Sequence, residues 1–312
     1  METTSVWKMT IKPHPEEGRE PFEWCRKRGI VGVGWSYAYE GCSSVPKNPL
    51  RRLKRREKGR VPQPVKRLSE EVSTGDFVWL QYKGKYFLCR VKKGEMLYGP
   101  EIGRSFLAND IGHARKVAWA EIREDLVPGI VQRALIVQRM LQRIRCSRSE
   151  IGMFRVLHRE SKKKPGWKPA FNPSRMSRQI KSMNLRAFNA QMTPDDWEDL
   201  VALWLQSRGW MLIKSSCFRS KPRFEFRMVR AGSSARTAYI QVKTGARQLR
   251  PLEYEEDVGP ETIVYLLSTA PEPYPGESVR GVKTLKPSEL KTWVSNHPDL
   301  IPSTLGLRLS IA

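Results

Sequence analysis

The sequence predicts two domains of different class: a β-rich, barrel-like domain, followed by an α/β (α+β) domain with a mixed central sheet. Two observations carry this prediction. Residues 1–130 contain short alternating apolar runs that are broken by glycine and other turn residues, which is typical of small β-barrels. Residues 191–312 begin with a strongly marked helix, continue with several strands and close with another helix, which is the order of an α/β layer.

Four runs of the first part have strand character. Lys83 and Gly84 lie between the second and third of these runs and predict a two-residue hairpin turn. Residues 126–145 keep a near-helical apolar spacing after Pro128, so we expect one helix there. The basic segment 50–60 has two open alternatives, a helix or a mobile arm. The four strand-like runs are "GIVGVGWSYA", "DFVWLQY", "KYFLCRVKKG" and "ARKVAWAEI".

A polar, basic and proline-punctuated stretch separates the two parts and has the composition of a linker. We therefore expect domains at residues 1–145 and 191–312, joined by a linker at 146–190. The second domain opens with a helix that has Thr193 as N-cap and Pro194 at its first position. Its expected strands are "WMLIKSS", "RFEFRMV", "AYIQVKTG" and "TIVYLLST", and its last helix is "KPSELKTWVSNHP".

Charge indicates the class of partner. The 312 residues include 56 Lys and Arg against 32 Asp and Glu, a formal net charge of +24, which favours a polyanionic partner. No apolar run approaches the ~20 residues of a membrane span, and no secretory signal pattern opens the chain. Five scattered cysteines without a CxxC pair favour a reducing cytoplasm, and the absence of a GxxxxGK[ST] motif argues against nucleotide hydrolysis.

Polar residues on two expected strands form the candidate active site. Phe224 and Phe226 should share one face of their strand, so that Glu225 points to the other. A hairpin through "RAGSSART" would then lay Gln241 and Lys243 beside Glu225. A neutral and a cationic side chain two residues apart need a polar group opposite them if they are buried. The alternative is a surface hairpin in which both side chains simply point into solvent.

This pattern, together with Glu198 on the preceding helix, resembles the PD-(D/E)xK nuclease superfamily, in its Mrr-like restriction-endonuclease branch that carries QxK. The resemblance spans residues 193–296. It implies a metal-dependent endonuclease, a hydrolase of restriction or antiviral (anti-phage) defence type, that cuts DNA; the missing GxxxxGK[ST] motif predicts that cutting needs no ATP from this chain. The implied catalytic residues are Glu225, Gln241, Lys243 and Glu198.

The same resemblance implies a site for Mg²⁺ or Mn²⁺, held by Glu225, Gln241, the Val242 carbonyl and Glu198. The chain departs from the family pattern at two positions. Glu225 stands where the family usually has aspartate, and the neutral Gln241 stands where it often has Asp or Glu. A hard cation accepts amide oxygens, but the loss of one negative charge should lower its affinity. For Glu198 the alternative is a solvated helix face.

The first domain looks like the EVE/PUA-like barrels that recognise modified bases, over residues 5–130. This looser resemblance implies that aromatic rings grip a flipped base, because base stacking is worth about 1–3 kcal/mol. The candidate rings, in order of preference, are Trp35, Trp79 and Trp119; the alternative for each is core packing. Two basic groups are candidates for the DNA backbone or for solvated loops: Arg51, Arg52, Lys54, Arg55 and Arg56 in the first domain, and Lys162, Lys163 and Lys164 in the linker.

The expected partner is therefore DNA, with RNA as an alternative and no membrane. A homodimer is an option, since two strands require two active sites. The rival hypothesis is a catalytically degenerate sensor or adaptor of phage defence, in which the nuclease fold only binds nucleic acid. An RNA-directed nuclease is a third alternative.

Overall fold

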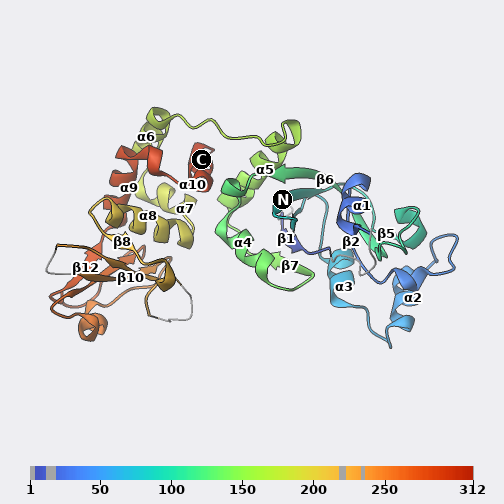
Figure 1. Cartoon of the computed structure of the whole chain (residues 1–312), viewed down its shortest axis with the longest axis horizontal. Coiled ribbons are helices and arrows are strands. Elements are labelled where there is room, and N and C mark those ends of the chain that lie inside the picture. Colours follow the sequence, from blue (N-terminus) through green and yellow to red (C-terminus); the bar gives the residue numbers. More distant parts are fainter. Residues whose placement is uncertain (1–3, 12–18, 218–222, 233–235, 312) are drawn as a thin grey trace. The chain divides into compact units, whose positions relative to one another are not determined.

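The computed structural model describes residues 4–11, 19–217, 223–232 and 236–311. The chain divides into two compact units, Met1–Pro169 and Ala170–Ala312, and each is described by itself. Both units mix helices with a sheet, so the protein belongs to the α+β class (Figure 1). Within the described residues, no helix combines the length and the apolar character that a membrane crossing requires.

The N-terminal unit is built on a curled, half-barrel sheet of seven strands. The strand order is β2-β6-β4-β3-β1-β7, with β5 also paired to β6. Only the β1–β3 pair is parallel, and all other pairs are antiparallel. The strands are β1 (Val6–Met9), β2 (Ile30–Val33), β3 (Phe77–Tyr82), β4 (Lys85–Val91), β5 (Leu97–Tyr98), β6 (His113–Ile122) and β7 (Leu141–Ile144).

Helices cover this sheet on both sides. On one side the main core includes Val31, Tyr39 and Leu80, all fully buried. On the other side Phe154 of α5 packs against the rings of Phe77 and Trp79. The helices of this unit are α1 (Pro21–Arg28), α2 (Pro49–Arg56), α3 (Gln63–Glu70), α4 (Gly129–Ile136) and α5 (Arg148–Lys163), with the short 3-10 helices η1 (Ser36–Tyr39), η2 (Gly99–Ile102) and η3 (Glu124–Leu126).

The predicted β3–β4 hairpin is confirmed. Lys83 and Gly84 form its two-residue turn, with φ of 47° and 75°. Positive φ at both central positions is the geometry of a type I′ turn, which matches the twist of the flanking strands. The basic segment 50–60 forms the helix α2, so the helical alternative holds.

The prediction of a single helix over residues 126–145 is wrong. The helix α4 ends at Ile136, and residues Leu141–Ile144 form β7, which pairs with β1 at the edge of the sheet. Short apolar runs satisfy helix and strand periodicity equally well. Here residues 141–144 form a strand because the edge of β1 is open to pair with them. Ile136, expected within a helical segment, is 79% exposed.

The predicted linker is largely helical. Ser147 accepts a hydrogen bond from the Glu150 amide, and the Glu150 carboxylate accepts from the Ser147 amide, a capping box that starts α5. The helix α5 belongs to the N-terminal unit, while α6 (Pro173–Ser182) and α7 (Leu185–Gln191) belong to the C-terminal unit. The boundary after Pro169 lies inside the stretch where it was expected.

The C-terminal unit holds a mixed sheet of five strands in sequential order. The strands β8 (Met211–Leu212), β9 (Phe226–Val229) and β10 (Thr237–Lys243) are antiparallel neighbours. The strands β11 (Thr262–Ser268) and β12 (Val282–Leu285) continue the sheet in parallel with β10. The α-helices of this unit lie together beyond one face of the sheet (Figure 1). The remaining elements are α8 (Pro194–Gln206), α9 (Pro287–Asn296), α10 (Ser303–Ser310) and the 3-10 helices η4 (Lys214–Ser216), η5 (Pro251–Asp257) and η6 (Pro298–Leu300).

The start of α8 follows the prediction. Thr193 accepts a hydrogen bond from the Asp196 amide, and the Asp196 carboxylate accepts from the Thr193 amide. Trp197, Leu200 and Val201 of α8 are fully buried in one core with Ile240 of β10. The helix α8 therefore covers the face of the sheet that carries Ala238, Ile240 and Val242 of β10.

Candidate functional site

Three of the four predicted catalytic residues meet at the β9–β10 pair. The amide of Glu225, one residue before β9, donates to the Ile240 carbonyl at 2.8 Å, which fixes the register of the two strands. The Gln241 side chain donates from Nε2 to Glu225 Oε1 at 3.0 Å. The Lys243 ammonium donates to the same oxygen at 3.1 Å. Glu225 therefore lies opposite Gln241 and Lys243, as the sequence predicts.

One local expectation for this site is wrong. Phe224 and Phe226 do not share a face: Phe224 packs on Tyr239 at 4.8 Å between ring centroids, whereas Phe226 is buried in the core under α8. The chain bends at Glu225 before β9 begins, so strict strand alternation does not extend back to Phe224. The bend leaves Glu225 facing Gln241.

The site is partly shielded from solvent. Gln241 is 1% exposed, and the side chains of Lys243 and Glu225 are 28% and 26% exposed. A charge pair at this depth is screened less than a surface pair, and the buried amide is satisfied by Glu225 and by the Val242 carbonyl at 3.3 Å. A carboxylate, an amide and an ammonium group are thus held together with their polar atoms paired.

The oxygen donors of this cluster match a hard cation in kind but are few in number. The Glu225 carboxylate and the Val242 carbonyl supply oxygens directly, whereas Gln241 presents its NH₂ group to Glu225. A turn of that amide about its last torsion would present Oε1 instead. No group of three or more His, Cys, Asp or Glu residues with metal-site geometry occurs among the described residues. The set fits a weakly held Mg²⁺ better than a tight one.

Glu198, the fourth predicted residue, comes from the other side of the sheet. It lies on α8, which packs against Ile240 and the rest of that core. Gln241 and Lys243 alternate with Ile240 along β10 and so lie on the other face of the sheet. Burial is the main cause that raises the pKa of the Cys217 thiol, and the Glu198 carboxylate adds to it. Glu198 is therefore close to Cys217.

A neighbouring acid of α8 has a structural role that sequence reasoning missed. Asp196 forms a buried ion pair with Arg308 of α10, in which the two side chains are 6% and 1% exposed. Arg308 also donates from Nε to the Gln191 carbonyl at 3.1 Å. The pair joins the start of α8 to the last helix. An arginine within the apolar run "LGLRLS" is the only sequence signal that could have indicated it.

The three candidate tryptophans of the N-terminal unit occupy different environments. Trp79 is fully buried against Phe154, so its ring contacts protein on both sides and we remove it from the base-binding candidates. Trp119 is half-buried and contacts the rings of Phe22 and Phe87. Trp35 is half-buried and has a left-handed backbone, with φ of 64°, a conformation that is uncommon for a bulky residue.

The surroundings hold Trp35 in that conformation. The Asp110 carboxylate accepts from the Ser36 amide at 3.0 Å and from its hydroxyl at 2.9 Å. A side chain at Gly112 would come within 2.8 Å of the Trp35 carbonyl, so only glycine allows this close approach. Strain of this kind, retained by specific contacts, concentrates at functional sites.

Of the predicted basic residues, Arg52 is held by hydrogen bonds to the backbone, and Lys163 lies 3.9 Å from the Glu160 carboxylate. Arg52 donates to the carbonyls of Ala38 at 2.5 Å and Glu40 at 3.4 Å, which ties α2 to η1, the element that follows Trp35. Within the described part of the chain, no hydrogen bond or ion pair engages the exposed cations of α2, which are Arg51, Lys54, Arg55 and Arg56. The linker lysines Lys162, Lys163 and Lys164 are exposed at the end of α5.

His113 has a role that sequence reasoning did not give it. Its ring is fully buried, with Nε2 2.9 Å from the Tyr39 hydroxyl and Nδ1 3.1 Å from the Gly34 carbonyl. Burial lowers the pKa of His113 to about 4, so the ring is neutral at pH 7. This neutral imidazole supports the segment that carries Trp35.

In comparisons with known proteins, no family model, no curated protein and no solved structure matches the chain.

Proposed function

We propose that this protein is a metal-dependent endonuclease that hydrolyses phosphodiester bonds of DNA, of the restriction or anti-phage defence type. The observation that carries the proposal is the contact of Glu225 Oε1 with both Gln241 Nε2 and Lys243 Nζ, at 3.0 and 3.1 Å, where the residue before β9 meets β10 in a mixed sheet. These are the residues that the resemblance to PD-(D/E)xK nucleases assigns to catalysis.

Each side chain of the cluster has a role in this chemistry. The Glu225 carboxylate and the Val242 carbonyl would hold Mg²⁺ or Mn²⁺, with Gln241 as a neutral third ligand. When bound, such an ion polarises a phosphoryl oxygen. Lys243, whose ion-pair partner among the described residues is Glu225, would be released to orient the attacking water and to stabilise negative charge on the phosphate.

We propose further that the N-terminal unit recognises the nucleic acid. Trp35, half-buried and conformationally strained, is linked through η1 to α2, because Arg52 of α2 donates to the Ala38 carbonyl. A stacking ring and a set of unpaired cations are thus carried by one locally connected structure. That combination suits a base taken out of its stack, with its flanking phosphates on α2.

The second candidate function is a catalytically degenerate sensor or adaptor. The observation that favours it is the neutral Gln241, which donates to Glu225 where a second carboxylate would bind metal. A nuclease directed at RNA is the third candidate, and the same charged and aromatic groups would serve it.

The experiment is cleavage of plasmid DNA, phage DNA carrying modified bases, and labelled RNA, in Mg²⁺ or Mn²⁺, by the full chain. We expect Lys243→Ala and Glu225→Ala to lower the cleavage rate at least about 100-fold, the size of effect seen when a catalytic electrostatic group is removed. Lys286→Ala is the matched control, since Lys286 is exposed and makes no side-chain cap for α9.

Equal rates for the wild-type and the Lys243→Ala and Glu225→Ala variants would refute the catalytic proposal. Retained DNA binding without cleavage by any of them would instead support the adaptor. Preferential cleavage of labelled RNA would identify an RNA-directed nuclease.

A further inference from the structure

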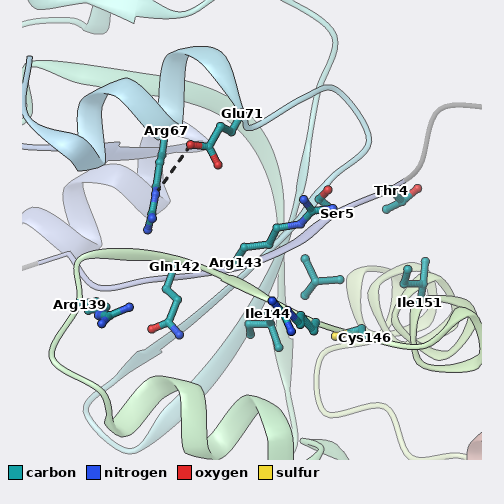
Figure 2. Close-up of a pocket in the computed structure, with 12 residues that line it drawn as sticks. Thr4, Ser5, Arg67, Glu71, Arg139, Gln142, Arg143, Ile144, Cys146 and Ile151 are labelled. Carbon is teal, nitrogen blue, oxygen red and sulfur yellow. Dashed lines mark ion pairs between the residues drawn. The ribbon is translucent and has the colours of Figure 1, made fainter.

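A pocket of about 690 Å³ lies in the N-terminal unit at the β7 edge of the sheet. Its walls come from β1, the end of α3, β7 and the start of α5, segments far apart in the sequence (Figure 2). It contains none of the residues assigned above to catalysis or to base recognition. Its volume falls within the range of small-molecule sites, about 300–1,000 Å³.

The charge of the lining is strongly positive. The lining contains four arginines, which are Arg67, Arg139, Arg143 and Arg145, and one carboxylate, that of Glu71. Glu71 forms an ion pair with Arg67, whose Nε lies 3.8 Å from Glu71 Oε1 (Figure 2). Arg67 Nη1 also donates to the Leu141 carbonyl at 3.1 Å. No hydrogen bond or ion pair to any described residue engages the guanidinium groups of Arg139, Arg143 and Arg145.

A further cation lies behind this wall. Lys8 of β1 is fully buried and pairs in register with Gln142 of β7. Its ammonium donates to the carbonyls of Val137 and Arg139, at 2.6 Å for the first. Both partners are neutral, so the charge of Lys8 is not cancelled locally. It adds to the positive potential of the Arg139 segment.

The rest of the lining is uncharged and mixed. Val6, Ile144 and Ile151 supply apolar surface, and Thr4 and Ser5 supply polar groups. Gln142 also lines the pocket, and its Oε1 is buried without a hydrogen-bond partner in the described structure. A buried acceptor of this kind is normally satisfied by a water or a ligand donor.

We propose that this pocket binds a nucleotide through its phosphate group. Free guanidinium forks match phosphate oxygens in geometry and charge. An isolated phosphate would leave most of the volume, the apolar wall and the Gln142 acceptor unused. A nucleoside attached to the phosphate fills them. The nucleotide is either a free molecule or the 5′-phosphorylated end of a single strand, since a pocket of this volume does not admit a duplex.

The test is isothermal titration calorimetry of the full chain with five probes: inorganic phosphate, AMP, ATP, and a short single-stranded oligonucleotide in two forms, with and without a 5′-phosphate. We expect saturable binding of one nucleotide or one phosphorylated end per chain, and at least tenfold weaker binding of inorganic phosphate. Binding of AMP or ATP assigns a free nucleotide, whereas binding of the phosphorylated oligonucleotide alone assigns a strand end.

Variants locate the binding. The double substitution Arg143→Gln with Arg145→Gln should weaken the interaction at least tenfold, and Arg143→Lys should weaken it less, because lysine keeps the charge and loses the fork. The matched control is Lys92→Gln with Lys93→Gln, two exposed cations that follow β4 and do not line the pocket; it removes the same charge elsewhere and should leave the affinity unchanged. Circular dichroism checks that each variant is folded.

No binding of any probe at millimolar concentration would overturn the proposal, as would equal weakening by the Lys92 and Lys93 control or equal affinity for inorganic phosphate. The proposal does not depend on nuclease activity. Lys243→Ala should bind the nucleotide as the wild-type chain does, so the failure of one proposal is distinguishable from the failure of the other.

Discussion

The candidate sites of the two units differ in how their charged side chains are partnered. In the C-terminal unit the charges that define its sites are paired, Lys243 with Glu225 and Arg308 with Asp196. In the N-terminal unit, the α2 cations other than Arg52, and Arg139, Arg143 and Arg145 of the β7 pocket, are exposed without an acidic partner among the described residues. Paired charges position one another for chemistry, whereas unpaired cations provide a surface for an anion. The difference separates a catalytic candidate from a binding one.

The largest expected effect tests the pairing in the C-terminal unit. Asp196→Ala leaves Arg308 buried at 1% exposure without its counter-charge and also removes the capping box of α8. Breaking one partner of a buried pair costs about 3–5 kcal/mol. Hydrogen exchange followed by mass spectrometry should show faster exchange of α8 and α10 peptides, with N-terminal peptides unchanged. Asp299→Ala, an exposed acid of η6, is the control, and a comparable effect from it would contradict the assignment.

The second prediction concerns pH and the N-terminal unit. The pKa of His113 is lowered by burial to about 4 in the folded state, against about 6.5 when unfolded. A depressed pKa gives stability that is fully present above pH 6.5 and is lost as the pH falls towards 4, because the unfolded chain takes up the proton first. The loss is about 3 kcal/mol. The pKa of His158 is also lowered by burial, so it acts in the same direction.

His113→Gln should flatten this pH dependence. The measurement is exchange of β6 and η1 peptides between pH 7 and pH 4.5, with intrinsic exchange rates corrected. His297→Gln in the C-terminal unit is the control, since the His297 ring is only half-buried, with Nδ1 2.8 Å from the Trp293 carbonyl. An unchanged slope in the His113 variant would show that other groups carry the acid sensitivity.

The same contrast explains what the sequence could and could not predict. Gln241 and Lys243 share a face of β10 and Glu225 directly precedes β9, so the register of two antiparallel neighbours brings them together, although alternation does not extend back to Phe224. The loop that the sequence predicts between these strands includes residues 233–235, which lie outside the described residues. The β7 pocket brings together residues near positions 5, 67 and 143, which are far apart in the sequence. The sequence around β7 predicts a helix, whereas in the structure it forms a strand that pairs with the edge strand β1. The partner of Asp196 is 112 residues away, and no local pattern reveals such a pair. Contacts between neighbouring strands can thus be predicted from the sequence, whereas contacts between residues far apart in the chain cannot.

The third prediction tests which tryptophan meets a base. Trp35→Ala should weaken binding to a duplex with a modified base by about 1–3 kcal/mol, the worth of one stacked base. Trp35→Phe keeps a ring face and should lose less. Trp79→Phe should leave the affinity unchanged, because Trp79 is fully buried against Phe154. Fluorescence anisotropy with labelled duplexes measures these affinities, and equal losses at both tryptophans would indicate a general effect on the fold.

The smallest effect separates the two sets of unpaired cations. Arg51→Gln with Arg55→Gln removes two exposed charges of α2, and each phosphate contact contributes about 0.9 to the dependence of log K on log salt concentration for duplex DNA. The slope should therefore fall by about two, while affinity at low salt drops for every sequence alike. Arg143→Gln with Arg145→Gln removes two charges from the β7 pocket and should leave this slope unchanged, because the pocket holds a nucleotide and not the duplex backbone. Equal slopes for both double variants would mean that the duplex follows one continuous basic surface, and the distinction between α2 and the pocket would be lost.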